Sequence, residues 1–166
     1  LAEGLSVRGE EGSAWTALED VLASPDAAVS PGSMKRVIER LVQQGRAEAA
    51  LEAIDRALTQ SLDDSGRAQW LALRGFVLEK GFEDQGGAEQ AWREAAALDP
   101  EQLEARLGIA TALAKRDASD ATETICLLSD HEIARASVEQ KVIFAGTLLR
   151  NHRADRALAV ARMIVV

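Results

Sequence analysis

Apolar residues recur along this chain at the three- and four-residue spacing of a helix face. One face of the stretch GGAEQAWREAAALDP, residues 86–100, carries a single large side chain among small ones: Ala88, Trp92, Ala95 and Ala96. The spacing predicts a helix, and Pro100 ends it because proline cannot continue the hydrogen-bonded ladder. Small residues allow close helix contact, and Trp92 is expected to fill the space that they leave. No stretch alternates β-branched and polar residues for long enough to form a strand, so we expect an all-α protein.

The same pattern recurs along the sequence. Residues 67–102 contain the ordered series Trp70, Leu73, Val77, Gly81, Ala88, Trp92, Ala95 and Pro100. The preceding segment contains it displaced by 36 residues before the turn and 38 after, at Met34, Val37, Leu41, Gly45, Ala50, Ile54, Ala57 and Leu62. Later copies contain Ile109, Leu113, Asp117, Ala121, Ile125 and Leu128, then Phe144, Leu148, His152, Ala157, Ala161 and Ile164. The change of displacement predicts two inserted residues, which fits GFEDQGG as a lengthened connection between two helices.

This series resembles the tetratricopeptide repeat (TPR), a helix-turn-helix unit of about 34 residues. In residues 67–102, Gly81 occupies the turn position, and Asp117 and His152 replace it in the last two units. The resemblance implies a right-handed α-solenoid of stacked helix-turn-helix repeats, in which neighbouring units bury the face that one unit cannot bury alone. It covers nearly the whole chain.

The repeats divide residues 1–166 as a single TPR-like solenoid segment. A partial repeat over 1–30 is followed by units at about 31–66, 67–102, 103–136 and 137–166, the last incomplete. There is no initiating Met and no signal sequence, so we expect an excised segment of a longer array. Its Ala- and Arg-rich character resembles bacterial arrays, including those of cell-envelope secretion and exopolysaccharide-export machines.

Composition narrows the function classes. The net charge of −8 argues against a nucleic-acid or anionic-membrane binder, and no segment is apolar enough to enter a bilayer. Cys126 is the only cysteine and is expected to be a small buried hydrophobe. His131 and His152 lie near helix boundaries, where a structural role is favoured over a catalytic one. We therefore expect no enzyme, cofactor or metal site.

Function is then expected on the inner face of the first helices, which usually carries it in TPR proteins. Projection onto a solenoid predicts a partner-binding groove of ten residues: Lys35, Glu39, Leu71, Gly75, Leu78, Leu107, Thr111, Val142, Gly146 and Leu149. Val42, Gln43, Glu79, Glu104, Ala114, Glu139 and Arg150 fall on the same projected face. Glycine weakens a helix by about 1 kcal/mol relative to alanine, so Gly75 and Gly146 suggest room for a close approach.

Three functions remain open at this stage. The first is a non-catalytic interaction scaffold that binds a protein or peptide in an apolar concave groove. The second is a helical-repeat RNA-binding module, which the net charge opposes, and the third is a structural spacer whose concave face is covered by its parent chain. A carboxylate clamp of the kind found in TPR cochaperones is disfavoured, because Glu104 stands where a basic group is expected.

Charge also differs between the two ends of the chain. Residues 1–30 carry six acids against Arg8, a net charge of −5, whereas residues 131–166 carry six bases against three acids, a net charge of +3. Sequence order becomes position along the axis of a repeat array. We therefore expect weak head-to-tail self-association that is screened by salt.

Overall fold

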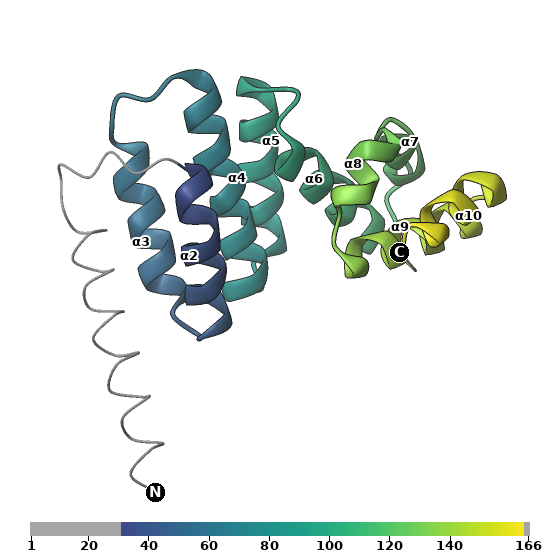
Figure 1. The fold of residues 1–166 in the computed structure, drawn as a ribbon, viewed down its shortest axis with the longest axis horizontal. Coiled ribbons are helices and arrows are strands. Elements are labelled where there is room, and N and C mark those ends of the chain that lie inside the picture. The colour runs from purple at the N-terminus through teal and green to yellow at the C-terminus, as the bar shows by residue number, and fades with distance from the viewer. Residues whose placement is uncertain (1–30, 165–166) are drawn as a thin grey trace, which may run out of the picture.

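The computed structural model describes residues 31–164, and these are all-helical with no strand, which confirms the predicted all-α class (Figure 1). The predicted partial repeat at 1–30 lies outside the described residues. The helices are α2 (Pro31–Gln43), α3 (Ala47–Leu58), α4 (Asp64–Gly81), α5 (Gln85–Leu98), α6 (Leu103–Lys115), α7 (Ala121–Cys126), α8 (Asp130–Arg135), α9 (Val138–Arg150) and α10 (Ala154–Arg162). None of these helices is long and apolar enough to cross a membrane.

Successive helices pair as hairpins that follow one another along the molecule, from α2 and α3 at one end to α9 and α10 at the other (Figure 1). The first helices α2, α4, α6 and α9 contact each other in order. The second helices α3, α5 and α7 each also contact the first helix of the following hairpin. Each hairpin therefore buries its apolar face against its neighbours.

The turns after the first helices share one backbone geometry. A residue with positive φ follows each first helix after one intervening position: Gly45, Glu83, Asp117 and His152. At three of these turns, the next amide donates to a carbonyl five residues earlier, as Arg46 N to Leu41 O (2.9 Å), Ala118 N to Leu113 O (3.0 Å) and Arg153 N to Leu148 O (2.8 Å). This bond satisfies a carbonyl that the helix end leaves free. The predicted turn role of Asp117 and His152 is confirmed.

The expected lengthened connection near residue 81 is instead a lengthened helix. Helix α2 ends two residues after Leu41, whereas α4 ends four residues after Val77. The two inserted residues therefore extend α4. The turn position predicted for Gly81 falls at Glu83 instead, which has positive φ. A side chain at Gly81 would collide with the side chain of Ala47, so glycine there serves close contact between α4 and α3.

Trp92 on α5 fills the space between two first helices, as its sequence position predicts. It is 4% exposed. A β-carbon built on Gly75 of α4 or on Gly108 of α6 would lie well under 3.0 Å from its ring. The indole Nε1 donates to the carbonyl oxygen of Ala72 at 3.2 Å, which satisfies its only polar group.

The third hairpin differs from the others because its second helix is interrupted. Helix α7 has six residues, and α8 follows after a short break. The sequence accounts for the new start, since Ser129 and Glu132 form a reciprocal capping box at the beginning of α8. Ser137 and Gln140 form a second such box that begins α9. These caps place the end of α8 beside the start of α9.

Candidate functional site

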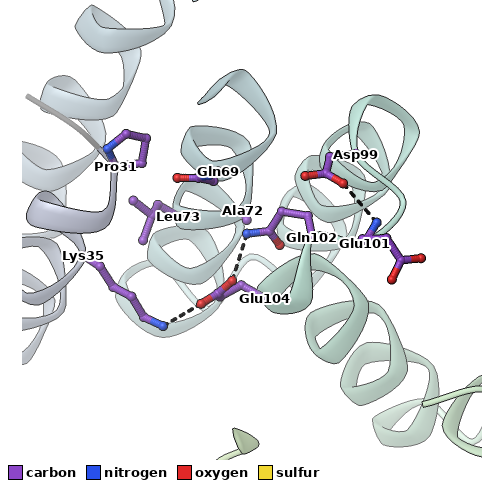
Figure 2. Close-up of a pocket in the computed structure, with 9 residues that line it drawn as sticks. All are labelled: Pro31, Lys35, Gln69, Ala72, Leu73, Asp99, Glu101, Gln102 and Glu104. Carbon is purple, nitrogen blue, oxygen red and sulfur yellow. Dashed lines mark hydrogen bonds and ion pairs between the residues drawn. The ribbon is translucent and has the colours of Figure 1, made fainter. Parts of the chain in front are cut away.

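A cleft lies along the first helices. Its volume is about 380 Å³, and its lining comes from α2, α4, α5, α6 and the region where α8 meets α9. The lining residues are Lys35, Glu39, Ala72, Leu73, Phe76, Glu79, Lys80, Trp92, Leu103, Glu104, Leu107, Gly108, Thr111, Arg135, Ser137, Glu139 and Gln140. A second hollow of about 320 Å³ adjoins it and shares Lys35, Ala72, Leu73 and Glu104 (Figure 2). The two form one continuous surface, which we call the cleft.

The floor of the cleft is apolar. Ala72, Leu73 and Phe76 of α4 contribute to it beside Leu107 of α6 and the ring of Trp92. Leu73 and Leu107 are buried, and Phe76 is partly exposed. A ligand on this floor would therefore remove apolar surface from water.

One ion pair joins the two walls of the cleft. Lys35 Nζ of α2 lies 2.8 Å from Glu104 Oε1 of α6, although these residues are 69 positions apart. Figure 2 shows the two side chains pointing toward one another, with Ala72 and Leu73 of α4 above them in the view. Gln102 donates to the other oxygen of Glu104 at 2.9 Å. Both charged side chains remain partly exposed, at 44% for Lys35 and 35% for Glu104.

The Glu104 carboxyl is held in its charged form. Burial by itself raises its pKa, but the hydrogen bond and charge of Lys35, with further hydrogen bonds from the backbone and Gln102, bring the pKa below its ordinary value. The pair therefore persists at neutral pH. It also engages Lys35, so a ligand carboxylate would have to displace Glu104 to reach that ammonium.

A second group of ion pairs crosses between α4, α6 and α9. Lys115 Nζ lies 2.6 Å from Glu79 and 3.7 Å from Glu139, and Lys80 Nζ lies 3.0 Å from Glu139. The hydrogen bond and charge of Lys80 lower the pKa of Glu139, and Lys115 adds to this effect against partial burial. These contacts link helices of three successive hairpins along one side of the cleft.

Arg135 offers the cleft an unengaged cation. It lies at the end of α8, and its guanidinium has no ion pair or hydrogen bond within residues 31–164. Nearby, Gln140 donates to the hydroxyl of Thr111 at 3.2 Å, which connects α9 to α6. Five donors in a planar fork make arginine a strong ligand for carboxylates.

The structure places four of the ten predicted groove residues in the cleft: Lys35, Glu39, Leu107 and Thr111. The other six lie elsewhere. Leu71 is 7% exposed and packs in the core beside Trp92, Gly75 lies directly against that ring, and Leu78 packs at the edge of the same cluster. These three positions do not form the open apolar face that was expected, because neighbouring helices cover it.

The predicted groove residues of α9 are not buried in the core, but they also lie outside the cleft. They are Val142, Gly146 and Leu149, of which Val142 and Leu149 are 56% and 59% exposed. Gly75 therefore makes room for Trp92 rather than for a partner. Gly146 has no such neighbour, since a β-carbon there would meet only Arg150 Nη1 at 3.6 Å.

The projection missed several cleft residues, notably Phe76, Lys80, Arg135 and Gln140. Phe76 and Lys80 follow Ala72 at four-residue intervals, which places them on the stripe of α4 next to the predicted one. A rotation of the assumed face by one position would have found both. Arg135 and Gln140 depend on the interruption between α7 and α9, for which the Ser129 capping box was the available signal.

The arrangement is suited to binding by charge and apolar contact. Its lining carboxylates Glu79, Glu104 and Glu139 are each paired with lysine, and neither His131 nor Cys126 lines it. Within residues 31–164, no group of acidic, histidine or cysteine side chains is placed to hold a metal ion. A search of known protein-family models and of curated proteins finds no match to this chain.

Proposed function

We propose that this chain is a TPR-like array of helical hairpins that acts as a non-catalytic interaction scaffold and binds a segment of a protein or peptide in the cleft. The observation that carries the proposal is the cleft itself, built by the first helices of successive hairpins. The recurring turn at Gly45, Glu83, Asp117 and His152 supports the repeat relation between these hairpins.

The chemistry of the cleft favours a polypeptide of mixed charge. Its rim carries cations and anions that alternate along the helices, with Lys35, Lys80 and Arg135 among Glu39, Glu79, Glu104 and Glu139. Partly exposed ion pairs contribute little to stability, so a ligand can exchange with one partner at small cost. Opening the Lys35–Glu104 pair would give a peptide access to Ala72 and Leu73 beneath it.

The same rim disfavours RNA. Four carboxylates would repel a phosphate backbone, and the whole chain carries a net charge of −8. Sequence-tolerant RNA binding also relies on exposed aromatic platforms. Trp92 is buried and Phe76 is only partly exposed, so the cleft offers no row of exposed rings on which successive bases could stack.

Selection from a displayed library of random twelve-residue peptides tests the proposal. We expect enriched peptides whose affinity falls at least tenfold on Arg135→Glu, because the substitution reverses the only unengaged cation among the cleft residues described. Arg36→Glu makes the same charge change at an exposed position of α2 outside the cleft, and it should leave binding within twofold of the unmodified chain.

The outcomes separate the remaining functions. Failure to enrich any peptide, or equal effects of the two arginine substitutions, contradicts peptide binding in the cleft and favours a structural spacer. Salt-sensitive binding of a single-stranded oligouridine, in the absence of peptide binding, contradicts it in favour of an RNA-binding module.

A further inference from the structure

Most charged side chains of the cleft cancel one another. The ion pairs that line or border it are Lys35–Glu104, Lys80–Glu139 and Lys115–Glu79. Among the charged side chains that line the cleft, only Glu39 and Arg135 lack an ion pair or hydrogen bond within the part of the chain that the structure describes. The cleft therefore offers a ligand one unpaired anion and one unpaired cation, and no ion pair has to break before either is used.

Glu39 is unpaired because the nearest lysine on its own helix reaches across the cleft. Lys35 lies four residues before Glu39 on α2, a spacing at which side chains of opposite charge can pair on one helix. Its ammonium instead bonds Glu104 of α6 at 2.8 Å. The Glu39 carboxylate is left partly exposed at the α2 end of the cleft.

Arg135 is unpaired for a similar reason. Glu132 lies three residues before it and Glu139 four residues after it, but both carboxylates are engaged elsewhere. Glu132 pairs with Arg106 at 2.6 Å. Glu139 pairs with Lys80 at 3.0 Å. Arg135 itself is exposed at the end of α8, so its guanidinium is accessible to a carboxylate that a ligand brings into the cleft.

The two unpaired charges belong to opposite ends of the cleft. Helices α2 and α8 lie on opposite sides of α4 and α6 along the row of hairpins (Figure 1). Between them lies the apolar floor, to which Leu73 and Phe76 of α4 and Leu107 of α6 contribute. Water screens charges less beside an apolar floor than on an open surface, so each unpaired charge there attracts an opposite charge more strongly.

We propose, on the basis of the proposed function, that the cleft selects a polypeptide segment with one basic and one acidic side chain on either side of apolar residues. The basic side chain binds Glu39, and the acidic side chain binds Arg135. The apolar residues between them cover the floor, which removes apolar surface from water. The unpaired charges thus fix which end of the segment lies over α2 and which lies beside α8.

The size of the cleft limits the spacing between the two charged residues of the ligand. The first helices contact each other in the order α2, α4, α6 and α9, and Arg135 lies just before α9. Packed helices are about 8–10 Å apart, so three such steps bound the separation at about 30 Å. An extended chain advances about 3.3 Å per residue, so the two charged residues lie at most about nine positions apart. Both therefore fit within one twelve-residue peptide.

Charge swaps between protein and peptide test this assignment by calorimetric titration. Two variants of one selected peptide are made: in the first the basic residue becomes glutamate, and in the second the acidic residue becomes lysine. Glu39→Lys should weaken the selected peptide about tenfold or more and restore binding of the first variant alone. Arg135→Glu should restore binding of the second variant alone. Glu94→Lys makes the same charge change at an exposed position of α5 outside the cleft, and it should leave all three affinities unchanged.

The outcomes distinguish this inference from the proposed function. Peptides that lose affinity on Arg135→Glu but respond to Glu39→Lys no more than to Glu94→Lys leave peptide binding in the cleft intact and overturn the assigned polarity. Restoration of the first variant by Arg135→Glu also overturns it, because the charges would then bind at the opposite ends. Failure to enrich any peptide overturns the proposed function and this inference together. Far-UV circular dichroism should be unchanged by both substitutions, since neither side chain has an ion pair to lose among the described residues.

Discussion

Gly108→Ala reverses the usual effect of replacing a helical glycine by alanine. In an open helix this change stabilises by about 1 kcal/mol. At Gly108 the new β-carbon would lie well under 3.0 Å from ring atoms of Trp92. The ring has little room to move, because it also lies against Gly75 and its Nε1 is bonded to the carbonyl of Ala72. Such overpacking costs about 1–3 kcal/mol.

The collision is expected to exceed the gain in helix propensity, so Gly108→Ala should lower the unfolding free energy by up to about 2 kcal/mol. Urea unfolding followed by far-UV circular dichroism, at low micromolar protein and with unchanged m-value, measures it. Gly146→Ala is the matched control, because the same change at an open site should stabilise by about 1 kcal/mol.

A double-mutant cycle identifies the cause. In a Trp92→Leu background the bulky ring is gone, so Gly108→Ala should become neutral or stabilising by up to about 1 kcal/mol. If Gly108→Ala stabilises the unmodified chain as much as Gly146→Ala does, then Trp92 does not lie against α6 and the packing argument fails. Equal destabilisation in both backgrounds would also refute the role of the ring.

Three further measurements follow from the packing and the charges. Trp92→Ala should lower the unfolding free energy by about 3–5 kcal/mol, and a loss below about 1 kcal/mol would place the ring outside the core. Leu71→Asp buries a charge in the core, so it should abolish cooperative thermal unfolding, whereas an open-groove position would tolerate it. The pKa of Glu104 is lowered on folding, so its contribution to stability is present above the ordinary value of 4.5 and is lost as the pH falls through the folded value. Lys35→Met should therefore reduce the loss of stability below about pH 4.5, measured by urea unfolding at a series of pH values, and an unchanged profile would contradict the pairing.

Much of the helical organisation could be predicted from local spacing. The position of Trp92 among alanines indicated close packing, and the place of Asp117 and His152 in the series indicated their turns. These features depend on residues near each other in sequence. The insertion near Gly81 was ambiguous because two extra residues can extend either a helix or a loop.

The open face could not be located in the same way. Periodicity gives the direction of a side chain around its own helix but not the angle between successive hairpins. Leu71 and Gly146 therefore looked equivalent, although Leu71 is covered by neighbouring helices and Gly146 has only Arg150 near it within the described residues. The Lys35–Glu104 pair depends on that angle as well, since it joins residues 69 positions apart.

The ion pairs across the cleft have a mechanical consequence. Lys35 joins α2 to α6, and Lys80 joins α4 to α9, so each bond spans an intervening first helix. Straightening the row of hairpins stretches these links, whereas bending it further compresses them. The ion pairs should therefore oppose elongation of the row of hairpins more than further bending. Salt screens exposed charges, so added salt should lower the force needed to elongate the molecule.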